Sequence, residues 1–390
     1  MLKSKWVFIA ILICTMLPLA ANATITRVIG LGGTNANYII TDASNPQIWP
    51  QLVTNWPNLA GVEFNTTTSG WTGYKAYLNY SFPNESVVAV SLDNLDGVRS
   101  MFYGNPEYTE LTTVPDLNGV GNTNSSKLSV TWGMPIQGGM KIGAALNVAQ
   151  HSYKNDTPIE DKASLIGINL GASFLDNKLD AAIGFETLSG SMKPGMSGTG
   201  EDKTDGSMAI NFAARYWWRY AEKMALVPNI RFLNMKDGVK YDGGDKASST
   251  TTDIKIGVGH NWTPVENTLA IFEIGVDLST DKLDTTSASA KYTDNSMPYW
   301  RIGFETQIFS WLNGRLGAER DWLAQKYDQG SKPEAAFANT NIFVGATAHW
   351  NRLYLDLLVN PSFFENGVYF VSGAGAPMFS RVSLKYDFNK

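Results

Sequence analysis

The chain has 390 residues, of which 44% are hydrophobic, 12% aromatic and 17% charged, and its formal net charge is −5. This acidic balance argues against a nucleic-acid partner, because a basic face is the usual footprint of nucleic-acid-binding proteins. The 36 glycines and many aromatic residues fit either a soluble β-protein or a membrane barrel, whose strands need lipid-facing residues only at alternate positions.

Residues 1–23 have the pattern of a secretory signal peptide. Lys3 and Lys5 begin the segment, an apolar stretch covers residues 6–16, and the small residues 21–23 (Ala-Asn-Ala) provide a cleavage site. The alternative is an N-terminal membrane anchor, but the apolar run is short for a helical span. The single cysteine, Cys14, lies in this segment, so we expect a mature chain without a disulfide or a thiolate metal site.

Residues 24–58 show no clean hydrophobic alternation and contain Pro46, Pro50 and Pro57. From residue 59 to residue 390, by contrast, segment after segment alternates with a period of two. In the stretch 166–174, Ile, Ile, Leu, Ala and Phe occupy one face while Gly, Asn, Gly and Ser occupy the other. The same alternation occurs in residues 179–186, 210–219, 272–277, 300–305, 353–360 and 381–388.

A soluble antiparallel sheet also alternates, with one face in the core and the other in water. Two features favour a membrane barrel. The candidate strands are commonly longer than about ten residues, which fits a tilted bilayer crossing better than a soluble strand. Short links near residues 135–137, 176–177, 221–222, 263–265 and 351 also alternate with long polar segments near 94–124, 150–160, 189–206, 235–249, 279–295, 325–337 and 360–375.

Aromatic residues are expected to form girdles where the strands meet the bilayer interfaces. The candidates are Trp217, Trp218, Tyr220, Tyr299, Trp300, Trp311, Trp322 and Trp350. Together these features predict an all-β fold, a transmembrane antiparallel β-barrel in the bacterial outer membrane, with residues 24–58 as an irregular plug in its lumen. Counting segments from residue 86 gives about fourteen strands, and segments 60–64 and 74–82 would add a hairpin to make about sixteen.

Ionisable residues on the polar faces of these strands should point into the lumen. The main candidates are Arg215, Arg219, Arg231, Glu273, Arg301, Glu305, Arg315, Glu319, Asp356 and Arg381. They can form a structural network of ion pairs across neighbouring strands, or they can line a polar conduit and set its selectivity. Because both signs of charge are mixed, no preference for anions or cations follows.

The two ends of the chain carry a family likeness. Residues 27–33 (Arg-Val-Ile-Gly-Leu-Gly-Gly), followed by residues 41–46 (Thr-Asp-Ala-Ser-Asn-Pro), resemble the start of the long-chain fatty-acid and aromatic-hydrocarbon transporters. Residues 379–388 resemble their closing strand, although Gln47 departs from the family's Asn-Pro-Ala motif and the chain ends on Asn389-Lys390 rather than on an aromatic residue. The resemblance implies a fourteen-stranded barrel for small hydrophobic molecules, with plug residues Gly32, Gly33, Asp42, Asn45 and Pro46.

Signals of catalysis are weak. The chain has three histidines, His151, His260 and His349, and the neighbours His151 and Ser152 should point to opposite faces of a strand. We therefore expect no enzyme activity, no metal site and no cofactor.

The leading functional hypothesis is a channel for passive uptake of small hydrophobic molecules. The alternatives are a general porin for polar solutes and a non-conducting interaction or scaffold barrel for an exported complex. The expected partners are outer-membrane lipid, lipopolysaccharide and the transported solute, while the oligomeric state is left open.

Overall fold

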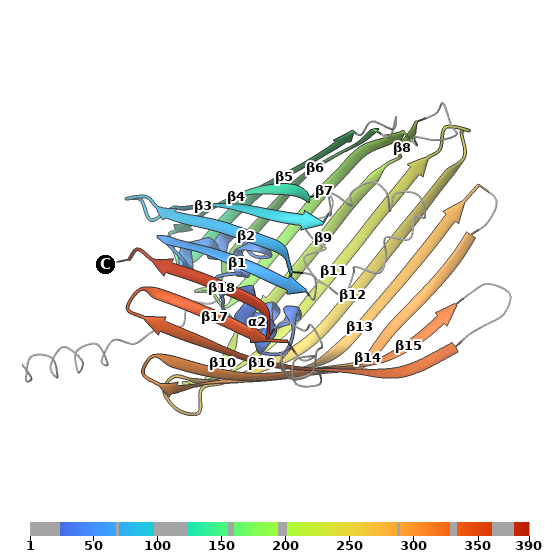
Figure 1. The fold of residues 1–390 in the computed structure, drawn as a ribbon. Coiled ribbons are helices and arrows are strands. Elements are labelled where there is room, and N and C mark those ends of the chain that lie inside the picture. The colour runs from blue at the N-terminus through green and yellow to red at the C-terminus, as the bar shows by residue number, and fades with distance from the viewer. Residues whose placement is uncertain are drawn as a thin grey trace, which may run out of the picture.

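The computed structural model describes residues 24–67, 70–96, 124–154, 160–193, 201–286, 289–327, 334–360 and 378–389. The predicted signal peptide, residues 1–23, lies outside these ranges. The described strands form one antiparallel sheet in which most strands pair with their neighbours in sequence. The first strand, β1, also pairs with the last, β18, from Leu59 opposite Asp387 to Asn65 opposite Arg381. The sheet therefore closes into a barrel (Figure 1).

The strands vary in length from one side of the barrel to the other. Their bounds are β1 Leu59–Thr67, β2 Gly70–Ser81, β3 Val87–Asp96, β4 Asn124–Ile136, β5 Met140–Lys154, β6 Glu160–Phe174, β7 Leu179–Lys193, β8 Asp202–Thr204, β9 Ser207–Tyr216, β10 Trp218–Ala221, β11 Met224–Lys240, β12 Lys246–Trp262, β13 Thr268–Thr285, β14 Ser289–Phe309, β15 Leu312–Tyr327, β16 Glu334–Trp350, β17 Leu353–Val359 and β18 Phe379–Asp387.

Three of these segments are pieces of one barrel strand. Both β8 and β9 lie between β7 and β11, and β10 continues β9 along β11. The 18 segments of the sheet therefore make a barrel of sixteen strands, the larger of the two counts that the sequence predicts. The extra hairpin is β1 with β2. The fourteen strands implied by the family resemblance are thus wrong for this chain.

The two faces of the wall differ in the way that the alternation predicts. In β6, Ile166, Ile168 and Leu170 point outward and are each at least 50% exposed, whereas Leu165 and Asn169 at the alternate positions are buried. Apolar side chains are exposed around the outside of the barrel, and most charged side chains in the middle of the strands are buried inside it. Because an outward apolar band beside a polar interior is the opposite of a soluble protein, this surface fits lipid.

Turns at one end of the barrel are short. Asn177, Asn267 and Asn351 have positive φ angles in these turns, a backbone conformation that asparagine tolerates better than most residues.

At the other end of the barrel, the prediction of a loop is wrong for two segments. Residues 235–249 and 279–295 lie mainly in β11, β12, β13 and β14, so only 241–245 and 286–288 separate these strands. Polar residues can extend a hydrogen-bonded ladder once a strand has left the bilayer. The hydropathy pattern therefore does not show where such a strand ends. The remaining predicted loops fall partly or wholly outside the described residues.

Exposed aromatic residues gather at the short-turn end, where Trp218, Trp262, Trp311 and Trp350 are all exposed. They form the girdle expected at a membrane interface. Two of the predicted girdle residues are instead buried in the lumen. Trp217 donates its indole N–H to Asp180 at 3.3 Å, and Tyr299 donates its hydroxyl to Glu273 at 3.2 Å. Both lie on the inward face of their strands, where a polar ring atom finds a partner.

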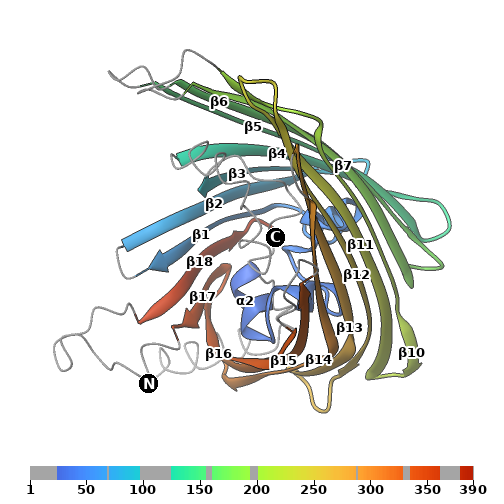
Figure 2. The ribbon, with the colours of Figure 1, turned by 90° about the vertical axis from the view of Figure 1, so that its right-hand side faces the viewer.

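Residues 24–58 lie inside the barrel near its short-turn end (Figure 2). They form one short helix, α2 (Ile25–Gly30), and three 3-10 turns, η1 (Thr34–Tyr38), η2 (Asn45–Gln47) and η3 (Pro50–Asn55). Within the described part of the chain, no helix has the length and apolarity needed to cross a bilayer. We call residues 24–58 the plug.

Candidate functional site

The plug touches the inner wall on several sides of the lumen. Its η3 turn packs against β3, β4, β5 and β6, while α2 packs against β15, β16, β17 and β18. Between these sides, Asn261 of β12 donates its side-chain amide to the carbonyl of Ile39 at 2.7 Å. Val28, Leu31 and Ile39 of the plug are fully buried. The plug therefore extends across the short-turn end of the lumen and is not confined to one strand.

A cluster of buried charges joins α2 to the wall. Arg27 donates its Nε to Glu305 at 2.9 Å and a terminal nitrogen to the same carboxylate at 2.8 Å. Arg315 donates Nε to the other oxygen of Glu305 at 2.9 Å and a terminal nitrogen to Asp356 at 3.1 Å. Asp356 in turn accepts the hydroxyl of Thr24 at 3.0 Å. We call these five residues the plug latch.

Arg27 also holds the plug together internally, because its remaining terminal nitrogen lies 3.1 Å from Asp42. Burial disfavours a charged guanidinium, but the carboxylates of Glu305 and Asp42 outweigh it and raise the pKa of Arg27 above its usual value. Arg27 therefore stays positively charged while it bridges two negative groups, one on the wall and one in the plug. Buried ion pairs of this kind hold geometry more than they add stability.

The predicted plug residues lie close together around Asp42. Its carboxylate accepts the backbone N–H and the hydroxyl of Ser44 at 2.9 and 2.8 Å, and its own N–H donates to Asn45 at 2.6 Å. Asn45 donates to the side chain of Asn37 at 3.1 Å, while the neighbouring Pro46 is buried at the start of η2. These contacts satisfy the polar atoms of a chain segment that has no regular secondary structure.

Gly32 and Gly33 lie where the plug meets β14 and β15. Their φ angles, +119° and +89°, belong to the region that side chains other than glycine rarely adopt. A Cβ at Gly33 would also lie 2.8 Å from the carboxyl carbon of Glu319. Both glycines are therefore required for the close approach of the plug to the wall.

A second arginine fixes the middle of the plug. Arg215 of β9 donates to the carbonyls of Asn37 and Ile40 at 2.9 Å each and to Asp180 at 2.8 Å. Its guanidinium lies 4.8 Å from the ring centre of Trp49 in the plug. A planar guanidinium can satisfy backbone carbonyls and stack on an aromatic face at the same time.

Glycines on the inward face of the wall make room for the plug. A Cβ at Gly143 in β5 would lie 2.5 Å from Cα of Gln51, and one at Gly133 in β4 would lie 2.7 Å from Val53. On the far side, a Cβ at Gly317 in β15 would lie 2.5 Å from the backbone nitrogen of Gly32. Any side chain at these positions would push the plug away from the wall.

The lumen has a charged side and an apolar side. On β11 to β14, ion pairs join neighbouring strands, with Arg231 3.0 Å from Asp253, Lys255 2.8 Å from Asp277 and Arg301 3.0 Å from Glu273. We call this the charged wall. On β5 to β11, a group of inward apolar side chains lies around the buried Glu186, which is directly opposite Ala209. We call these apolar side chains the apolar stripe, consisting of Ala149, Leu165, Leu188, Ala209, Leu233 and Met235.

The apolar stripe lies beyond the plug along the strands. Asn169 donates to the carbonyls of Gln47 and Ile48, so it marks the level of the plug on β6. Leu165 lies four residues further along β6 on the same face, a distance of about 13 Å at the usual rise of a strand. Ala149 and Leu188 lie directly opposite Leu165 on the two neighbouring strands.

Most of the predicted lumen charges are buried on the inward face. Glu319 accepts the side-chain amide of Asn341 at 3.1 Å, and Arg381 is half-buried beside Asn65. Arg219 is the exception, because it is exposed at the short-turn end of β10. Arg219 lies directly opposite Ala225 on the inward face, as the alternation predicts, but burial does not extend to this end of the strand.

Arg27, the residue that links plug and wall most directly, is not among the site residues that the sequence predicts. In the sequence it is only one member of the glycine-rich phrase at residues 27–33. Its signal is a single basic residue inside the apolar segment Ile25–Gly30, which indicates a buried partner of opposite charge. The inward glycines also gave a signal, because glycine in a strand marks a close approach of another backbone.

Comparisons with known proteins found similarity only to solved structures. No protein-family model matches the chain, and no curated protein sequence matches it. The alcaligin outer-membrane receptor FauA from Bordetella pertussis is similar over 77% of this chain and 60% of its own, with 9% identity and a TM-score of 0.44. The ferric citrate transporter FecA in its unliganded form is similar over 78% and 51%, with 9% identity and a TM-score of 0.45.

A third structure, BamA from Haemophilus ducreyi lacking POTRA domains 1–3, is similar over 84% of this chain and 69% of its own, with 8% identity and a TM-score of 0.39. The chain thus spans about half to two thirds of the length of these structures. The closed sixteen-stranded wall, the outward apolar band and the aromatic girdle decide the class. The chain is a β-barrel of the bacterial outer membrane.

Proposed function

We propose that this barrel is a plugged channel for the passive uptake of small hydrophobic molecules. The observation that carries the proposal is the seating of the plug across the lumen through polar contacts with the wall. Arg27 to Glu305 and Thr24 to Asp356 are hydrogen bonds between plug and wall that can break and re-form without covalent chemistry. A channel with such a plug can close to other solutes and open when the plug shifts.

The lining of the lumen supports a solute with apolar surface. The apolar stripe places several neighbouring aliphatic side chains on the inward face beyond the plug, including Leu165, Leu233 and Met235. These side chains are buried while the plug is seated, and a solute would contact them once the lumen opens. Beside it, the charges of the charged wall are paired with one another, so they offer little to a polar solute unless a pair is broken. The resemblance of the N-terminal phrase to hydrocarbon transporters points the same way. Passive uptake of this kind needs no catalytic residue and no cofactor.

The alternatives make different demands on the lumen. A general porin for polar solutes needs a lumen that stays open, whereas the plug here is seated on several strands. A scaffold barrel for an exported complex needs no passage at all and would keep its plug seated under every condition.

Uptake into proteoliposomes tests the proposal. Vesicles containing the refolded chain should take up a small aromatic hydrocarbon several times faster than empty vesicles, and a sugar of similar size no faster. Equal acceleration of both solutes would favour the porin, and acceleration of neither would favour the scaffold. Leu233→Asn, which places an amide in the apolar stripe, should slow the uptake of the hydrocarbon.

A further inference from the structure

The outer face of the barrel carries a basic surface that the channel function does not use. Lys162 in β6, Lys193 in β7 and Lys203 in β8 are exposed and lie on the same side of the wall as Ile166 and Phe185, which face lipid. Lys203 lies directly opposite Lys240 of β11, and Lys240 lies directly opposite Lys246 of β12. Residues that face each other across a ladder point to the same side. These lysines therefore form a row across the outside of the wall.

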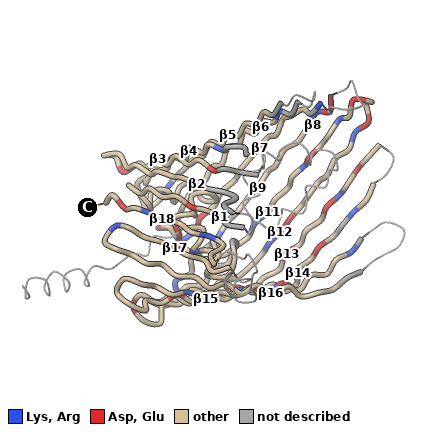
Figure 3. Tube along the Cα trace, in the orientation of Figure 1, with Lys and Arg blue, Asp and Glu red and all other residues tan. Residues whose placement is uncertain are grey.

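We call this surface the lysine patch and add Lys236, which lies four residues before Lys240 in β11 and therefore on the same face. The carboxylates of Glu201 and Asp205 lie among these lysines, at 3.2 Å from Lys203 and 2.7 Å from Lys246. The turn that joins Lys240 to Lys246 also carries the exposed residues Asp242 and Asp245, so six lysines outnumber four carboxylates. In a chain with a net charge of −5, this surface is locally basic. Figure 3 shows basic residues at these far ends of the strands.

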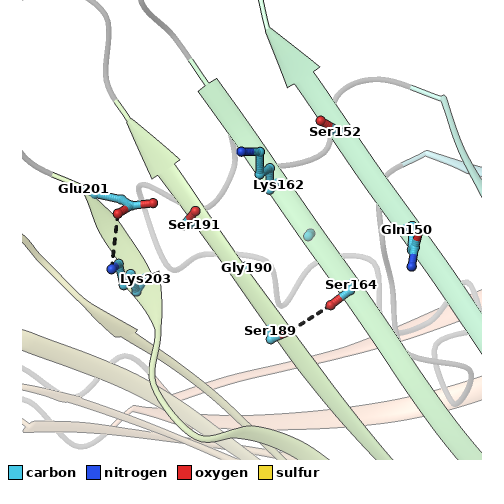
Figure 4. A pocket seen from close by; sticks show the side chains of 10 residues that line it. Gln150, Ser152, Lys162, Ser164, Ser189, Gly190, Ser191, Glu201 and Lys203 are labelled. Atoms are coloured by element: carbon cyan, nitrogen blue, oxygen red, sulfur yellow. Dashed lines mark hydrogen bonds and ion pairs between the residues drawn. The ribbon is translucent and has the colours of Figure 1, made fainter.

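An open hollow of about 660 Å³ lies within the patch. Figure 4 shows that its lining brings Lys162 and Lys203 together with serine hydroxyls from β5, β6 and β7. Two of these hydroxyls, on Ser164 and Ser189, lie 2.7 Å apart. Lysine ammonium groups and serine hydroxyls are donors suited to a phosphate or to the hydroxyls of a sugar.

The height of the patch relative to the membrane identifies what it faces. Lys162 lies four residues beyond Ile166, which corresponds to about 13 Å along the strand and about 9 Å along the membrane normal for a strand tilted by roughly 45°. That places the ammonium group level with the lipid headgroups and not with the hydrocarbon. The patch lies at the end opposite the short turns, which is the outer face of the membrane in barrels of this class.

We propose that the lysine patch on β6, β7, β8, β11 and β12 binds the phosphorylated headgroup of lipopolysaccharide in the outer leaflet. The phosphates face Lys162, Lys203 and Lys240, while the serine hydroxyls of the hollow bind the sugar to which the phosphates are attached. The acyl chains then lie along the apolar band that begins at Ile166. This assignment concerns the outer face of the wall and holds whether or not the lumen conducts.

The test compares two pairs of substitutions that remove the same charge. Lys162→Gln/Lys203→Gln changes the patch, and Lys178→Gln/Lys223→Gln changes two exposed lysines in turns at the opposite end of the barrel. Fluorescent lipopolysaccharide is titrated into each refolded full-length chain in detergent, and its anisotropy is recorded. Heat-dependent gel mobility confirms that every variant is folded.

The patch variant should bind lipopolysaccharide on the order of tenfold more weakly than the parent, and the turn variant should bind like the parent. Lipopolysaccharide stripped of its phosphates should bind the parent and both variants with the same reduced affinity. Equal affinity of the patch variant and the parent would overturn the proposal, as would an equal loss in the turn variant. Inorganic phosphate should not displace the fluorescent lipopolysaccharide when the two are present at equal concentrations of phosphate groups. Displacement under these conditions would also overturn the proposal, because the site would then bind a soluble anion equally well.

Discussion

Removing Arg27 from the plug latch should open the channel. In the seated plug this side chain lies 2.8 Å from Glu305 and 3.1 Å from Asp42, and all three groups are buried. Arg27→Ala leaves Asp42 with hydrogen bonds from Ser44 and no guanidinium, while Glu305 keeps its contact with Arg315.

The size of the effect follows from the buried charge that remains. Removing one partner of a buried ion pair costs about 3–5 kcal/mol, and the lower end applies here because Glu305 retains Arg315. About 3 kcal/mol corresponds to a shift of roughly a hundredfold in the equilibrium between seated and released plug, at 1.4 kcal/mol for each factor of ten. The barrel itself should fold normally because the substitution lies in the plug.

Single-channel recording measures this equilibrium as the fraction of time that the channel is open. Arg27→Ala should raise that fraction by one to two orders of magnitude, whereas Arg219→Gln, which alters an exposed arginine at the end of β10, should leave it unchanged. Arg27→Met combined with Asp42→Asn leaves no carboxylate unpaired in the plug and should close the channel again in part. A folded Arg27→Ala protein that opens no more often than Arg219→Gln would refute the latch.

Three further substitutions test other parts of the account. Gly143→Ala places a Cβ against the plug at a cost of about 1–3 kcal/mol, so it should raise the fraction of time that the channel is open in single-channel recordings. Gly243→Ala, where a Cβ would meet open space, should leave this fraction unchanged. Leu233→Asn should slow hydrocarbon uptake into proteoliposomes about fivefold or more without altering sugar uptake, and equal effects on both solutes would count against the apolar stripe. Leu170→Lys, in the middle of the lipid-facing band, should lower the free energy of unfolding in vesicles by about 2–4 kcal/mol, whereas Val265→Lys in a short turn should change it by less than about 0.5 kcal/mol.

The wall of the barrel was predictable from the local sequence pattern, because the polarity of each residue indicates whether it faces the lipid or the lumen. Ile166, Ile168 and Leu170 face lipid in the structure as the alternation predicts. Ladder length was harder to predict. Beyond the bilayer, long parts of β11 to β14 lack a regular apolar alternation, so the hydropathy does not distinguish the first part of β12, residues 246–252, from a loop.

The partners inside the lumen could not be predicted in the same way. Alternation placed Glu305 and Arg315 inside, but their pairing depends on the register of β14 against β15, which sets Glu305 directly opposite Arg315. The contact of Arg27 with Glu305 joins residues 278 apart in sequence and depends on the path of an irregular segment. Such contacts follow from the closed fold and not from any local signal.

The most direct test of the plugged channel is the single-channel conductance of the refolded barrel with and without residues 24–58. The account predicts that the intact protein is closed for most of the recording and that the shortened protein conducts steadily. A steady open pore in the intact protein would contradict the plug, and a shortened protein that stays silent although folded would contradict the channel.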